Sequence, residues 1–122
     1  MTSFETVVEH ESAAVPGVRF RVRRMTFGRR IELTKRVREL AQRIEFAEAG
    51  ETFAGKVEAS LATLEVERLY LDWGLESVSG LTADGEPVDR ENAAERAPEA
   101  LTREMIAAIK HECGLSEEER KN

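Results

Sequence analysis

The sequence predicts an α+β fold, mainly α: a long antiparallel helix hairpin with a small N-terminal β element and a C-terminal helix. Apolar and basic residues alternate before residue 25, and three later stretches repeat apolar residues at intervals of three and four. At 122 residues the chain is close to the most common domain size. We therefore expect one domain over 1–122, made of a β element (1–25), the hairpin (26–74) and a turn region with C-terminal helices (75–122).

The N-terminal β element is predicted as two short extended pieces joined by a turn at Pro16-Gly17. In the second piece Val18, Phe20 and Val22 alternate with arginines. A period of two sends alternate side chains to opposite faces of a strand. We therefore expect the arginines to form the solvent-facing side of this strand.

Two long helices follow. Thr26 is a candidate N-cap for the first and Gly50 a candidate C-terminal glycine, while the second should run from about Thr52 to Trp73 and stop at Gly74. The connection between them is short, so the helices should pair as an antiparallel hairpin. The expected hairpin core is Leu40, Ile44, Leu61 and Leu64.

After Gly74 the helical period breaks, and Asp84-Gly85 predicts a small hairpin or tight turn. Asp89 should cap a short helix, and Pro98 suits the first turn of the C-terminal helix. The buried residues of that helix should be Leu101, Met105, Ala108, Ile109 and Cys113. Ser116 and Glu119 have the spacing of a capping box.

The residues argue against catalysis. The only histidines are His10, in a polar N-terminal strand, and His111, at a charged helix end, and we expect both to be structural or exposed and not catalytic bases. Together with the one cysteine they provide at most three nitrogen or sulfur ligands, one fewer than a structural zinc site needs. No glycine pattern typical of phosphate binding occurs. We therefore expect no enzyme activity, no catalytic residue, no cofactor and no metal. The start lacks a secretory leader and no long apolar run occurs, so a cytoplasmic location without membrane contact is expected.

The charge distribution gives the one candidate binding feature. Between Arg19 and Arg43 the sequence has ten basic and two acidic residues, although the whole chain carries a net charge of -6. This segment could contact nucleic acid, an acidic protein or a neighbouring copy of the chain, or be ordinary solvated surface. The acidic net charge disfavours nucleic acid. The provisional partner-binding residues are Arg19, Arg21, Arg23, Arg29, Arg36 and Arg43.

From Pro16 onward the chain resembles the tail assembly chaperones of long-tailed bacteriophages and prophages. The resemblance rests on "PGVRFRVRRMTFGRRIELTKRVRELAQRIEFAEAGE", "EVERLYLDWGLESVSGLTADGEPV" and "APEALTREMIAAIKHECGLSEEERKN". It implies a non-enzymatic protein of the host cytoplasm that binds the tape-measure protein, supports tail-tube assembly and is absent from the mature virion. The N-terminal strands depart from the mainly helical pattern of that family. A homo-oligomer, a small nucleic-acid-binding or regulatory phage protein using segment 19–43, and a structural virion component remain alternatives.

Overall fold

A computed structural model describes residues 1–50 and 52–114 of the chain. It confirms the mainly α, α+β fold class. The chain divides into two compact units, which we describe separately: a helical unit, Thr26–Leu69, and a sheet unit containing residues 1–25 and the chain from Tyr70 onward. The helices are α1 (Phe27–Ala49), α2 (Phe53–Gly74), α3 (Ala93–Arg96) and α4 (Glu99–Glu112); the strands are β1 (Val7–Glu11), β2 (Arg19–Arg23), β3 (Leu75–Ser79), β4 (Thr82–Ala83) and β5 (Glu86–Pro87).

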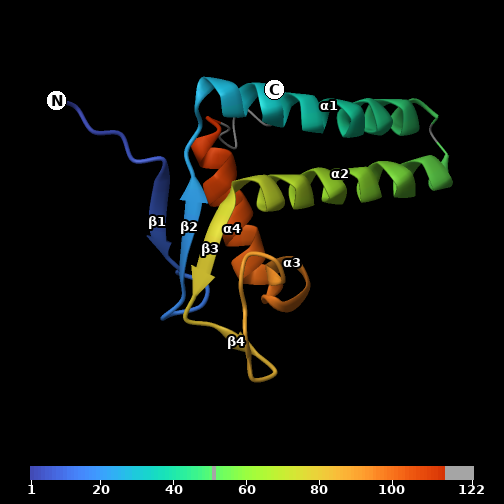
Figure 1. Cartoon of the computed structure of the whole chain (residues 1–122). Helices are drawn as coiled ribbons and strands as arrows, with labels where there is room; N and C mark the ends of the chain where they lie inside the picture. The colour runs from blue at the N-terminus through green and yellow to red at the C-terminus, as the bar shows by residue number, and fades with distance from the viewer. Residues whose placement is uncertain (51, 115–122) are drawn as a thin grey trace. The chain divides into compact units, whose positions relative to one another are not determined.

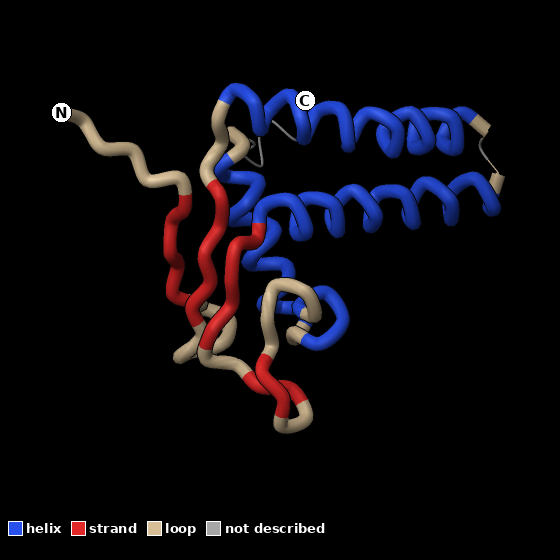
Figure 2. The backbone as a smooth tube through the Cα atoms, viewed as in Figure 1, coloured by secondary structure: helices blue, strands red, loops and turns tan. Residues whose placement is uncertain are grey.

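The sheet unit is built around a three-stranded antiparallel sheet with β2 in the centre (Figures 1 and 2). β1 and β2 are the two predicted extended pieces. β3 was not predicted as a strand of this sheet: it begins directly after the last residue of α2, and its pairing with β2 is interrupted by an irregularity between Arg21 and Val22. The N-terminal β element is therefore completed by a strand from the middle of the chain.

The core of the sheet unit lies between β2 and α4. Val18, Phe20 and Val22 are buried, as the alternation predicts, while Arg19 and Arg21 are exposed. The predicted apolar stripe of the C-terminal helix is also buried at Leu101, Met105, Ile109 and Cys113, with Ala108 half-buried. Figure 1 shows α4 running behind the strands, so the helix stripe covers the apolar side of the sheet.

The turn region follows the prediction in part. Asp84 and Gly85 both have positive φ, 53° and 82°, as a tight turn between β4 and β5 requires. The short helix begins later than predicted. Asp89 does not cap it directly: the backbone N–H of Asn92 donates to Asp89 Oδ1 at 3.0 Å, the N–H of Asp89 donates to Asn92 Oδ1 at 2.8 Å, and α3 starts at Ala93. The predicted Ser116–Glu119 capping box lies outside the described residues.

The predicted ends of the hairpin helices are confirmed to within one residue. Thr26 Oγ1 accepts the N–H of Arg29 at 3.3 Å, and α1 begins at the next residue, Phe27. Thr52 does the same for α2, accepting the N–H of Gly55 at 2.9 Å. Each hydroxyl satisfies an N–H group that has no partner inside its helix.

Gly74 is the last residue of α2, but its role is more than to end the helix. A Cβ at this position would overlap with Ile109 Cγ2 and lie 2.9 Å from Ile109 Cγ1. Both residues are buried in the sheet unit. Glycine is therefore required here for the close approach of the end of α2 to α4.

We expect Gly74→Ala to lower the free energy of unfolding by about 1 to 3 kcal/mol, because the new methyl group must displace a buried side chain. Gly28→Ala is the matched control, since a Cβ at residue 28 meets no atom within 4 Å. It should be neutral or slightly stabilising through higher helix propensity. Urea denaturation of both variants provides the measurement, and equal midpoints would contradict the assignment.

Glu104 on α4 holds the segment that joins β1 to β2. Its carboxylate accepts the Ser12 hydroxyl at 2.5 Å and the Ala13 N–H at 2.7 Å. Desolvation by burial opposes its ionisation, but hydrogen bonds from Ser12 and from the N–H groups of Ala13 and Ala14 outweigh it, so the pKa of Glu104 is lowered. The ionised form therefore stabilises the folded state.

Because the pKa of Glu104 is lowered in the folded state, Glu104 contributes to the free energy of unfolding. This contribution is complete above the pKa of an unfolded glutamate, about 4.3, and is lost as the pH falls through the pKa of the folded state. At pH 7 Glu104→Gln should be less stable by about 1 to 2 kcal/mol, because hydrogen bonds to a charged acceptor are lost. The difference from the parent protein should shrink below about pH 4. Thermal unfolding at several pH values tests this; a gap of the same size at pH 3 and pH 7 would refute it.

Candidate protein-binding surfaces

The structure divides the predicted partner-binding arginines between the two units. Arg19, Arg21 and Arg23 are on β2, in the sheet unit, whereas Arg29, Arg36 and Arg43 are on α1, in the helical unit. Neither unit therefore contains the whole predicted set.

Most of these arginines have acidic partners in their own unit. Arg19 Nη1 lies 3.8 Å from Glu9 Oε2, and Arg23 Nε lies 3.0 Å from Glu76 Oε2. On α1, Arg36 Nη2 lies 3.0 Å from Glu32 Oε1, one helical turn away. These pairs are partly exposed, so each contributes little to stability. They nevertheless reduce the positive charge that the basic segment can offer to a polyanion.

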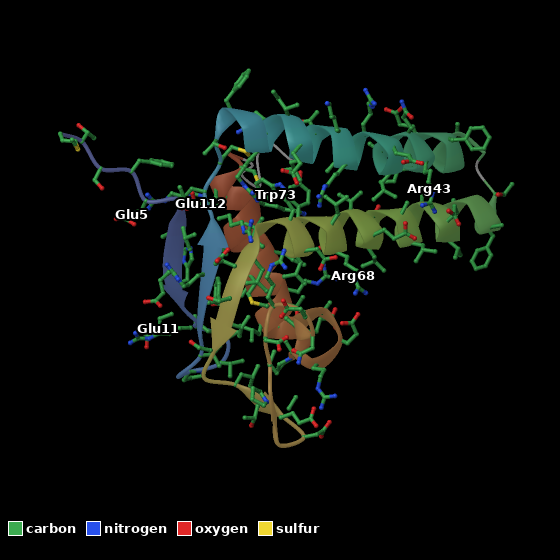
Figure 3. The ribbon with its side chains drawn as sticks, viewed as in Figure 1. Glu5, Glu11, Arg43, Arg68, Trp73 and Glu112 are labelled. Carbon is green, nitrogen blue, oxygen red and sulfur yellow. The ribbon has the colours of Figure 1, made fainter. Side chains whose placement is uncertain are left out.

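Arg43 joins the two helices of the hairpin. Its guanidinium is hydrogen-bonded to Glu58 and, at 2.9 Å, to Glu65 Oε2, both on α2. Figure 3 shows Arg43 in the space between α1 and α2. The hydrogen bond that Arg43 donates to Glu58, followed by the one it donates to Glu65, raises the pKa of Arg43 above its usual value. Arg43, predicted to contact a partner, thus has an internal role in pairing the helices.

The predicted hairpin core is wrong on α2. Leu61 and Leu64 are 48% and 52% exposed, whereas the buried residues of this part of the helix are Ala59 and Ala62. Leu40 and Ile44 on α1 are half-buried. The reason is that α2 has apolar residues on more than one side, and its small residues are on the buried side.

The large apolar residues form a continuous row, which we call the α2 stripe: Phe53, Val57, Leu61 and Leu64. Their spacing of four, four and three residues places them on one side of the helix. Arg68, seven residues after Leu61, shares that side, and Figure 3 shows Arg68 directed away from α1. The α2 stripe therefore faces away from the helix with which α2 pairs.

α1 has exposed apolar residues of its own. Phe27 is 84% and Ile31 43% exposed, and Phe46, near the other end, is 86% exposed. Phe46 borders a groove of about 490 Å³ that is also lined by Glu39, Gln42, Arg43 and Glu58. Two of its lining residues, Arg43 and Glu58, already pair with each other across the hairpin.

The candidate reactive residues do not assemble a site. His10 stacks on Phe20 with ring centroids 5.3 Å apart, His111 is exposed and Cys113 is buried. Across residues 1–50 and 52–114, no three His, Cys, Asp or Glu side chains cluster as metal ligands would. In the same part of the chain, no helix combines the length and apolar character needed to cross a membrane.

Comparison with known proteins gave no similarity that bears on function: no family model matches the chain, and neither a curated protein nor a solved structure matches it.

The exposure of the α2 stripe predicts a small stability effect. Leu61→Ala and Leu64→Ala should each cost about 1 kcal/mol or less, because these side chains are already half in water. Leu101→Ala, at a fully buried leucine, should cost about 2 to 5 kcal/mol. Chemical denaturation of the three variants compares them directly. A core-sized loss at Leu61 would mean that the α2 stripe is covered in solution.

Proposed function

We propose that this protein is a non-enzymatic tail assembly chaperone that binds the tape-measure protein of a bacteriophage tail, with the α2 stripe as the contact surface. The observation that carries the proposal is the exposed row from Phe53 to Leu64. A long helix with a continuous apolar side is suited to lie along a helix of a partner.

The exposed apolar area sets the expected affinity. Covering the half-exposed Val57, Leu61 and Leu64 gains about 1 kcal/mol each, and covering Phe53 gains about 2 kcal/mol. Association costs several kcal/mol or more in lost freedom of motion. The α2 stripe alone therefore supports weak, reversible binding, as a chaperone that later leaves its partner requires. Stronger binding needs further contacts from the flanks of the helix.

The alternatives have less support. The basic residues that would contact nucleic acid are largely paired with Glu9, Glu76, Glu32, Glu58 and Glu65 of the same chain. Lost ion pairs would offset part of any gain from phosphate contacts. The resemblance to tail assembly chaperones supports the proposed partner, host cytoplasm as the place of action, and release before the virion is complete.

The test is binding of the purified protein to helical fragments of a tape-measure protein encoded beside it, measured by isothermal titration. We expect micromolar affinity that survives an increase in salt from about 50 to 200 mM, since apolar contacts are not screened. Leu61→Ser combined with Leu64→Ser should abolish binding. Thr63→Ser, at an exposed position on another side of α2, is the matched control.

Two outcomes would overturn the proposal. The first is duplex DNA binding at micromolar affinity at the higher salt, without fragment binding, which would favour the nucleic-acid function. The second is a dimer that the double serine variant converts to a monomer without changing fragment binding. In that case the α2 stripe would be a contact between copies of this chain.

A further inference from the structure

The outward side of the first half of α1 differs chemically from the α2 stripe. Phe27, Ile31, Lys35 and Arg38 follow one another at four, four and three residues, the same spacing as in the α2 stripe. We call this row the α1 stripe. All four side chains are exposed, and they cover about 16 Å along the helix, or three turns. One end of the α1 stripe is apolar and the other is basic.

The α1 stripe faces away from α2. Leu33 is buried, and Val37, Leu40 and Ile44 are half-buried, so these four residues mark the covered side of α1. Their positions are roughly opposite those of the α1 stripe on a helix of 3.6 residues per turn. A partner on the α1 stripe would therefore not displace the hairpin contacts.

The surroundings of the α1 stripe are basic. From Thr26 to Arg38 the sequence has five basic residues and one acidic residue. Within the described residues, Lys35 and Arg38 form no ion pair, in contrast to Arg36 and Arg43. Phe27, Ile31 and Lys35, with Arg30 and Thr34, also line a shallow hollow of about 240 Å³. An apolar group can enter this hollow while carboxylates contact the adjacent cations.

We propose that the α1 stripe binds an acidic amphipathic helix of another protein. The apolar side of that helix would cover Phe27 and Ile31, and its carboxylates would lie against Lys35 and Arg38. Charge complementarity selects this partner, because Lys35 and Arg38 have no carboxylate partner among the described residues. Duplex DNA fits less well, because its charged phosphates would have to lie against the apolar side chains of Phe27 and Ile31. An anionic membrane fits less well too, since two apolar residues give little area to insert.

This second surface is separate from the α2 stripe and does not depend on the tape-measure proposal. The probe is a fluorescent helical peptide of about 20 residues, roughly two turns longer than the α1 stripe, with leucines on one side and glutamates on its flanks. A second peptide replaces each glutamate with lysine. Fluorescence anisotropy should show binding of the acidic peptide and at least tenfold weaker binding of the lysine peptide.

The variant Lys35→Glu with Arg38→Glu should weaken acidic-peptide binding at least tenfold and restore binding of the lysine peptide. Phe27→Ser should also weaken it. Arg21→Glu with Lys56→Glu is the control, because it changes the net charge equally at exposed positions outside the α1 stripe. Leu61→Ser with Leu64→Ser should leave acidic-peptide binding unchanged, which separates this test from that of the α2 stripe. Circular dichroism checks that every variant is folded.

Three results would overturn the proposal: equal binding of the two peptides, equal weakening by the control variant, or no peptide binding. Anionic vesicles or duplex DNA that bind more tightly than the acidic peptide, with loss of binding in the Lys35→Glu, Arg38→Glu variant, would assign the α1 stripe to lipid or nucleic acid instead.

Discussion

A helix in a two-helix hairpin is covered by its neighbour on one side only, and α2 has apolar residues on more than one side. In this protein the covered side contains Ala59 and Ala62, while the large residues from Phe53 to Leu64 are on the other. Two alanines provide little apolar area for helix pairing. Arg43 supplements them by binding Glu58 and Glu65 across the hairpin. Because the small residues are on the inner side, the large apolar residues from Phe53 to Leu64 stay exposed.

Pairing within the fold also reduces the number of basic residues that segment 19–43 can offer to a partner. Three of its nine arginines are on β2, where alternation directs them away from α4. Acidic residues of neighbouring strands pair with two of these, Arg19 and Arg23. On α1, Arg29, Arg36 and Arg43 follow one another at intervals of seven residues and lie on or near the covered side. From there Arg43 reaches α2. On α1, Lys35 and Arg38 are exposed and form no ion pair within the described residues, so they remain available for an external contact. A charge excess in sequence therefore overestimates the charge available for binding.

The sequence predicted those features that depend on local periodicity and on capping. Alternation along β2, threonine caps at Thr26 and Thr52, and the Asp84-Gly85 turn each act over a few residues. β3 was missed because its place in the sheet depends on pairing with β2, far away in sequence. Leu61 and Leu64 were assigned to the core because apolar spacing shows that residues share a side, without showing which side meets α1. The ion pairs of Arg43 were also missed, because they join residues of two different helices and no local sequence pattern predicts them.

The two exposed stripes make different demands on a partner, although their residues have the same spacing. At the α2 stripe the gain comes from apolar area, which salt does not screen. At the α1 stripe part of the gain comes from two exposed cations, which salt does screen, and the apolar part is limited to Phe27 and Ile31. Because each stripe faces away from the opposite helix, neither partner needs to displace the other. If both proposals are correct, the hairpin would hold two different helices at once, and raising the ionic strength would release the acidic one first.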